Sequence, residues 1–148
     1  MLGAAEAVTL AREANNVLAA AIARHPHRFG GFATVPTPAP NTAAEELEHA
    51  VTKLGLKGAL TNGRPGGRFL DDPFFWPILE AAERLAVPIY LHPAAPTSAV
   101  REASYEGISP AVGHCLSVGA WGWHMDTGLH APRLIAADVF DRFTSCRS

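Results

Sequence analysis

Three short apolar segments, spaced almost evenly along the chain, restrict the possible folds more than any other feature. They are Phe29–Val35, Lys57–Thr61 and Val87–Leu91, and their first residues lie roughly 28 to 30 positions apart. Each is continuously apolar rather than alternating, which is typical of parallel strands buried on both faces. A repeat of this length fits one strand and one helix per unit. The pattern therefore predicts an α/β fold with a parallel sheet.

Helical patterns fill the segments between the strands. Thr42 followed by Glu45 resembles a capping box, Gly55 is an expected helix stop, and Asp72-Pro73 is a favourable helix start. Proline-, alanine- and serine-rich sequence after His92 predicts a loop. The expected helices cover residues 4–24, 42–54 and 72–85, and a largely helical stretch runs over 112–143 with an interruption near Pro132.

Three parallel strands are too few for a complete α/β domain of a common type. A (β/α)8 barrel needs eight strands and ~250 residues, whereas this sequence has 148. A doubly wound sheet of five strands would almost fit the length, but only three strands can be found. The expectation is therefore a single unit, residues 1–148, that forms part of a larger fold.

Composition bears on whether the protein binds nucleic acid, enters a membrane or is secreted. The net charge of −2 gives no sign of a nucleic-acid-binding surface, and no apolar run approaches the ~18 residues that would span a membrane. The first residues lack the basic and apolar regions of a signal peptide. Cys115 and Cys146 do not have metal-ligand spacing, which favours free thiols in a cytoplasmic protein.

Catalytic groups in parallel α/β folds lie at the carboxyl ends of strands, which here are followed by Pro36, Asn62 and His92. An imidazole at His92 could bind a divalent metal through one ring nitrogen while an acceptor fixes the other. The alternative is a hydrogen-bonded histidine at the rim. Asn62 could donate to a substrate carboxylate, or could serve as a turn residue with positive φ in Asn62-Gly63.

Other polar residues are weaker candidates. Arg64 and Arg68 follow the second strand and suit a planar carboxylate, although loop arginines are usually solvated. His25-Pro26-His27 follows a helix, so a solvated turn explains it better than a metal motif. Asp71 and Asp72 are expected to be a loop residue and a helix cap. Trp121 and Trp123 are expected to pack or to line an apolar pocket.

Several segments in register resemble the amidohydrolase-related enzymes of the amidohydrolase superfamily, and most closely the aromatic-acid decarboxylases such as γ-resorcylate and 2,3-dihydroxybenzoate decarboxylase. The resemblance runs from about Glu6 to Phe143, and residues 144–148 do not look like the family. The segments that carry it are Arg24–Pro36, Gly55–Gly63, Leu70–Glu80, Val87–Pro93 and Trp121–Ile135.

The resemblance implies a TIM-type (β/α)8 barrel of which this chain holds approximately strands 3–5. It implies one divalent metal ion (Zn, Mn or Mg), bound by a motif on strand 1, a histidine after strand 5 and an aspartate after strand 8. Only the strand-5 ligand maps onto this sequence, at His92. A small carboxylic acid substrate and a homo-oligomeric full-length form are further implications.

The full-length enzyme is accordingly expected to be a metal-dependent decarboxylase of an aromatic or unsaturated carboxylic acid. Two alternatives stay open. A metal-dependent hydrolase could use the same scaffold, with the metal activating water. The isolated chain could also be an inactive truncated product, because catalytic zinc sites use about three protein ligands and His92 supplies one.

Overall fold

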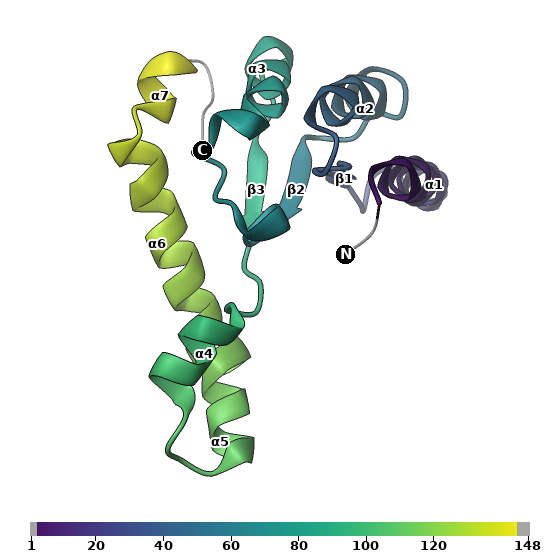
Figure 1. Ribbon diagram of the computed structural model, residues 1–148. Coiled ribbons are helices and arrows are strands. Elements are labelled where there is room, and N and C mark those ends of the chain that lie inside the picture. Colours follow the sequence, from purple (N-terminus) through teal and green to yellow (C-terminus); the bar gives the residue numbers. More distant parts are fainter. Residues whose placement is uncertain (1–2, 145–148) are drawn as a thin grey trace.

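The computed structural model describes residues 3–144, and its helices and strands alternate along the chain (Figure 1). The elements, in order, are α1 (Ala4–Ala23), β1 (Ala33–Thr34), α2 (Pro40–Thr52), β2 (Ala59–Asn62), the 3₁₀ turns η1 (Pro65–Gly67) and η2 (Pro73–Phe75), α3 (Trp76–Leu85), β3 (Ile89–His92), α4 (Ser98–Tyr105), α5 (Pro110–Cys115), the π-helical turn η3 (Leu116–Ala120), α6 (Gly122–Ala136) and α7 (Val139–Arg142).

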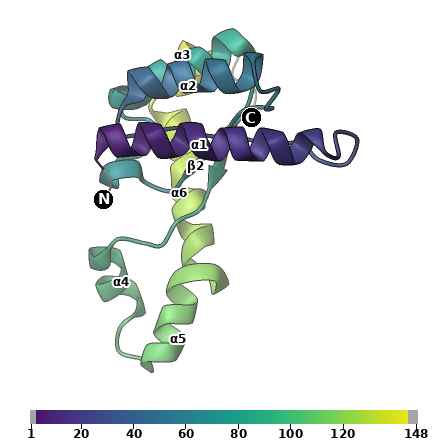
Figure 2. The same ribbon diagram turned by 90° about the vertical axis from the view of Figure 1, so that its right-hand side faces the viewer.

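The three strands form one parallel sheet in the order β1-β2-β3, which confirms the predicted α/β class. Ala59 of β2 pairs with Ala33 on one side and with Ile89 on the other. Helices α1, α2 and α3 lie side by side along the sheet, and α6 runs along the β3 side (Figures 1 and 2). No helix within residues 3–144 has the length and apolar character needed to cross a bilayer.

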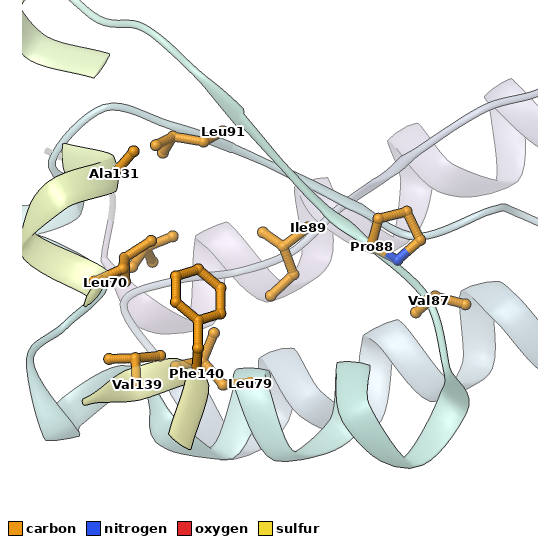
Figure 3. A pocket seen from close by; sticks show the side chains of 10 residues that line it. Leu70, Leu79, Val87, Pro88, Ile89, Leu91, Ala131, Val139 and Phe140 are labelled. Atoms are coloured by element: carbon orange, nitrogen blue, oxygen red, sulfur yellow. The ribbon is translucent and has the colours of Figure 1, made fainter. Parts of the chain in front are cut away.

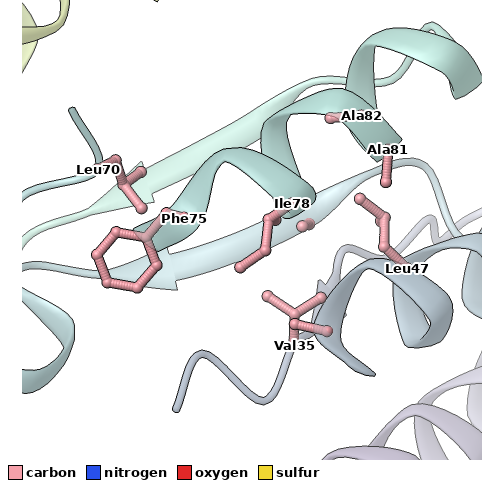
Figure 4. Packing of buried hydrophobic residues seen from close by; sticks show 9 residues of the cluster. Val35, Leu47, Leu70, Phe75, Ile78, Ala81 and Ala82 are labelled. Atoms are coloured by element: carbon pink, nitrogen blue, oxygen red, sulfur yellow. The ribbon is translucent and has the colours of Figure 1, made fainter. Parts of the chain in front are cut away.

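The main core lies between the sheet and helices α2 and α3 (Figure 4). Leu47 of α2 and Ile78 of α3 are fully buried between the two helices. Phe75 and Leu70 belong to the same buried cluster. Side chains of a strand alternate between faces, so Ala59 and Thr61 of β2 point to these helices and are buried. The next residue along, Asn62, points to the opposite face and is exposed.

The outer edge of β1 is covered by a side chain of α1 rather than by another strand. The Asn15 amide accepts a hydrogen bond from Thr34 N and donates one to Thr34 O, each 2.9 Å long. Asn15 also donates to the Glu46 carboxylate, which pairs with Arg12. A buried amide that satisfies both backbone groups of Thr34 protects this edge from pairing with another chain.

Several predicted boundaries are wrong. The first strand contains only Ala33–Thr34 rather than Phe29–Val35, because only those residues find a partner in β2. The predicted capping box at Thr42 does not form. Helix α2 begins two residues earlier at Pro40, whose fixed φ suits the first helical position. Asp72, in contrast, accepts from Phe74 N as the expected cap, and this bond holds its pKa below the ordinary value.

The segment after His92 differs most from its prediction. It contains α4 and the start of α5 instead of a loop, and these helices project away from the sheet (Figures 1 and 2). Helix α6 also continues through Pro132 without a break. Pro132 and Gly128, four residues before it, both lie on the exposed side of α6, where water can bond the carbonyl that loses its partner.

Candidate functional site

Asn62 and His92 are direct neighbours at the carboxyl ends of β2 and β3. Their Cα atoms are partners in the parallel register, and each is the last residue of its strand. Both side chains lie on the sheet face opposite the packed helices, because the preceding row, Thr61 and Leu91, faces the helices. The structure therefore brings the two predicted site residues together, as expected for neighbouring parallel strands.

The His92 ring has one nitrogen fixed and the other available. Nδ1 lies 2.7 Å from the carbonyl oxygen of Pro93. A carbonyl oxygen can only accept, so Nδ1 carries a proton, and in the neutral ring Nε2 keeps its lone pair. This is the tautomer that can bind a metal through Nε2 while a carbonyl oxygen holds the ring at Nδ1. Tyr90 and Trp123 flank the ring at centroid distances of 6.4 and 6.3 Å.

Asn62 is a strand residue, and Gly63 makes the turn. The positive φ of 47° belongs to Gly63, so the alternative that Asn62 supplies it is wrong. Gly63 N donates to His92 O over 2.7 Å, which extends the β2–β3 pairing by one step. A Cβ on Gly63 would lie 2.3 Å from the Cβ of Ala94. The Asn62 side chain itself is exposed and has room to meet a ligand.

Both loop arginines pair with a carboxylate of the chain, but only Arg64 is largely buried, whereas Arg68 stays exposed to solvent as expected. Arg64 donates to the buried carboxylate of Asp126 at 3.0 Å, and its guanidinium lies 4.7 Å from the Phe69 ring centroid. Arg68 pairs with Asp72 at 3.0 Å. Because the Arg64 side chain is largely buried and already holds a carboxylate, Asn62 is better placed than Arg64 to receive a substrate.

Sequence reasoning missed a cluster that ties the loop after β2 to α6. We call Arg64, Phe69, Asp126, His130 and Arg133 the loop clasp. Leu70 N donates to His130 Nε2 over 2.9 Å, Arg133 pairs with Asp71 at 2.6 Å, and Arg133 lies over the Phe69 ring at 4.3 Å. The clasp fixes the loop that follows Asn62 against the helix that carries Trp123.

His130 is fully buried, and this sets its charge. Burial lowers its pKa below the ordinary histidine value; Arg133 and Arg64 lower it further, whereas Asp126 and Asp71 oppose the shift. A neutral ring is also what the geometry requires, because Nε2 accepts from a backbone N–H. His130 is therefore a structural acceptor and not a ligand directed at the His92 site.

A complete metal site is not found within residues 3–144. No group of three histidine, cysteine, aspartate or glutamate side chains there could hold an ion. Within these residues His92 could supply one metal ligand, through the Nε2 nitrogen that Pro93 leaves available. His25 and His27 lie in an exposed turn, as predicted. The predictions for Cys146 and for the tail after residue 144 lie outside the described residues.

An apolar pocket lies beside β3, and unlike the strand ends at Asn62 and His92 it has no polar side chain in its lining (Figure 3). Its lining comes from β3, α3, α6, α7 and the segments just before η2 and β3. It contains no titratable side chain: Leu70, Leu79, Val87, Pro88, Ile89, Leu91, Ala131, Leu134, Val139 and Phe140. A carboxylate would find no donor side chain there.

The family described as Amidohydrolase matches residues 1–147. The chain belongs to this amidohydrolase family. Decarboxylase orsB of Emericella nidulans is 42% identical over 135 residues, which cover 89% of this chain and 40% of orsB. Gamma-resorcylate decarboxylase of Rhodococcus jostii is 40% identical over 150 residues, covering 95% of this chain and 44% of that enzyme.

A solved structure of a decarboxylase is also similar to this chain. The dihydroxybenzoic acid decarboxylase of Polaromonas sp. JS666, with bound manganese and the inhibitor 2-nitroresorcinol, superposes with a TM-score of 0.88 and 35% identity. The superposition covers 99% of this chain and 44% of that one. All three of these relatives are decarboxylases by name, two of them of aromatic acids, and one was solved with bound manganese. The chain spans less than half the length of these three proteins.

Proposed function

We propose that this chain forms the central part of a metal-dependent decarboxylase that acts on an aromatic carboxylic acid. In this proposal residues 1–148 are one piece of a (β/α)8 barrel and contribute strands 3–5. His92 supplies one ligand to a divalent cation, zinc, manganese or magnesium. Asn62 donates a hydrogen bond to the substrate carboxylate. The remaining ligands come from strands outside these 148 residues.

The observation that carries the proposal is the pairing of Asn62 with His92 at one sheet edge, with His92 Nε2 left available. A ligand held at His92 Nε2 would lie beside the amide of Asn62, because the two residues share one row and one face. Trp123 and Tyr90 add aromatic walls that suit a planar ring. When bound, the cation would act as Lewis acid and template for the acid.

The relatives favour decarboxylation over hydrolysis on this scaffold. The two curated relatives named above are decarboxylases, and so is the manganese-bound structure. The isolated chain is expected to be inactive, because a cation bound through one imidazole alone is held weakly. A stoichiometric, chelator-sensitive cation on the purified chain would contradict that expectation.

A chimera tests the proposal. Residues 1–143 replace the matching segment of the Rhodococcus jostii enzyme, which supplies the other strands. Decarboxylation of γ-resorcylate (2,6-dihydroxybenzoate) and bound manganese are then measured. We expect an active chimera in which His92→Ala lowers kcat/KM by at least ~100-fold, the upper end of the loss seen when a metal ligand's supporting partner is removed.

The same chimera provides the controls. His27→Ala, in the exposed turn, should leave activity and manganese content unchanged. Asn62→Ala should raise KM for the carboxylic acid while the manganese content stays constant. The proposal fails if a folded chimera with His92→Ala keeps both its manganese and its turnover.

A further inference from the structure

The second half of helix α6 does not pack closely against the sheet. The apolar pocket beside β3, with a volume of about 180 Å³, lies between them (Figure 3). Ala131 and Leu134 line the pocket from the helix, and Ile89 and Leu91 line it from the strand. The contacts that fix the position of α6 along the sheet must therefore include its polar side chains.

The inward side of α6 carries polar side chains that reach the loop after β2. A surface helix normally buries an apolar stripe, whereas the buried residues of α6 are Gly122, Asp126 and His130. Asp126 binds Arg64, and His130 accepts a hydrogen bond from Leu70 N. Residues four apart lie on one face of a helix, so both contacts hold the same side of α6.

The Arg64–Asp126 pair connects the end of β2 to the helical turn that carries Trp123. Trp123 lies three residues before Asp126, which places the two side chains on neighbouring parts of one helical face. The Trp123 ring centroid is 6.3 Å from that of His92. At the other end of the pair, Arg64 follows the last residue of β2, Asn62, by two positions.

This ion pair is built to keep one geometry. The Asp126 and Arg64 side chains are only 4% and 19% exposed. Nε and a terminal nitrogen of Arg64 each lie 3.0 Å from Asp126 Oδ1, and the guanidinium also lies over the Phe69 ring. Charge-assisted hydrogen bonds are strong where little water competes for them. The pair therefore restrains the distance between the strand end and α6.

We propose that Asp126 is a positioning residue of the site at the ends of β2 and β3. Acting through Arg64, it holds Trp123 beside His92 and so sets the space left for a planar acid. The Asp126 carboxylate does not touch the substrate, because it is buried and already bound to Arg64. The effect on the substrate rests on the proposed function, whereas the position of Trp123 beside His92 does not.

Nuclear magnetic resonance of the 148-residue chain tests this geometry without any activity. An indole ring shifts the resonances of nearby protons, so the His92 Hε1 resonance reports on Trp123. His92→Gln identifies this resonance, and Trp123→Ala gives its position without the indole. Asp126→Asn keeps the size of the side chain but removes its charge. We expect Asp126→Asn to move the His92 resonance toward its position in Trp123→Ala.

Two further variants separate positioning from a general loss of structure. If Asp126 acts through Arg64, the double variant Arg64→Gln/Asp126→Asn should shift the His92 resonance no further than the larger single change. The double variant leaves neither charge buried without its partner, so it should fold even where Asp126→Asn does not. Arg84→Ala breaks an exposed pair with Glu48 and, as the control, should leave the resonance unchanged. Far-UV circular dichroism checks that each variant is folded.

The chimera described above tests the consequence for substrate binding. Asp126→Asn should raise KM for γ-resorcylate by about 2- to 10-fold, the range of one aromatic contact, while the manganese content stays constant. Arg84→Ala should change neither quantity. A chimera that has no turnover before any of these substitutions would count against the proposed function, and the resonance of His92 would then decide the role of Asp126 alone.

Three results would overturn the proposal. An unchanged His92 resonance in the folded variants would show that other contacts hold α6. Additive shifts from Arg64→Gln and Asp126→Asn would show that the two residues do not act through each other. In an active chimera, a KM that Asp126→Asn leaves unchanged would show that the position of Trp123 does not affect the substrate.

Discussion

His130 is buried, so a positive charge on its ring is unfavourable, and we expect the stability of the protein to depend on pH through this residue. Its pKa is lower in the folded state than the ordinary value of 6.5. Between those two pKa values the unfolded chain binds the extra proton, so stability rises with pH there. Above about pH 6.5, the contribution of His130 to the free energy of unfolding should therefore be fully present. Below that pH the free energy of unfolding should fall, by at most ~1.4 kcal/mol per pH unit.

Urea titrations between pH 5 and 8 measure this dependence. His130→Gln keeps an acceptor for Leu70 N but cannot titrate, so its free energy of unfolding should vary less with pH than that of the wild type. His27→Gln removes an exposed histidine and should keep the wild-type slope. An unchanged slope in His130→Gln would show that His130 is not the titrating group.

Gly58 is fixed by the approach of the neighbouring strand. Its φ is 154°, and a Cβ there would lie 2.2 Å from the backbone oxygen of Pro88. A backbone oxygen cannot shift without distorting the neighbouring strand, so Gly58→Ala should destabilise the protein by about 2–3 kcal/mol. Gly30→Ala is the control, since its Cβ would meet only Lys57 at 3.8 Å. Thermal unfolding compares the two.

The site residues differ in how far sequence could predict them. Asn62 and His92 were found because each ends an apolar strand, and parallel strands bring their carboxyl ends together. The loop clasp was not found. Arg64 and Asp126 are 62 residues apart, and nothing in the local pattern around Arg64 distinguishes a buried ion pair from a solvated side chain.

At the scale of elements, the end of α3 is strained. Ala86 adopts φ 52° and ψ 44° while its N–H and that of Val87 close the helix onto Ala82 O. This conformation is unfavourable for every residue with a Cβ, and glycine is preferred there. Ala86→Gly should raise the free energy of unfolding by about 0.5–1 kcal/mol. Ala86→Val should lower it, because a β-branched side chain crowds this conformation further. Chemical denaturation measures both.

The loop clasp should contribute more stability than a surface ion pair. Asp126→Ala leaves the largely buried Arg64 without its carboxylate, which should cost about 3–5 kcal/mol. Arg84→Ala breaks the exposed pair with Glu48 and should cost less than ~1 kcal/mol. Equal losses in urea unfolding would mean that water screens the Arg64–Asp126 pair as well.

Element prediction succeeded where local and tertiary signals agree. The second and third strands were placed within about two residues, since each is apolar and ends at a turn or proline. The first strand was predicted too long because Phe29 and Gly30 have strand-like neighbours in sequence but no strand beside them. Helix α4 was missed because prolines on either side of Ser98–Tyr105 suggested a loop, although Ala, Glu and Arg within it favour a helix.

At the scale of the whole molecule, helices cover one face of the sheet, and the other face is largely open within residues 3–144. Helices α1, α2 and α3 bury one side, whereas the row Thr34, Leu60 and Tyr90 points to the other. Tyr90 and Phe32 stack there at a centroid distance of 6.0 Å, and both are exposed. A barrel interior is packed with side chains from all of its strands, so this face agrees with the proposal that the chain is part of a longer barrel.

The open face should limit the solubility of the isolated chain more than its stability. Replacing Phe32 and Tyr90 together by threonine removes exposed apolar surface, so the concentration at which the chain stays monodisperse in light scattering should rise, while the free energy of unfolding changes by less than ~1 kcal/mol. Phe75→Thr is the contrasting variant, because Phe75 is buried in the main core and its loss should unfold the protein. If the double variant instead unfolds like Phe75→Thr, the open face is packed in solution, and the sheet has two covered sides rather than one.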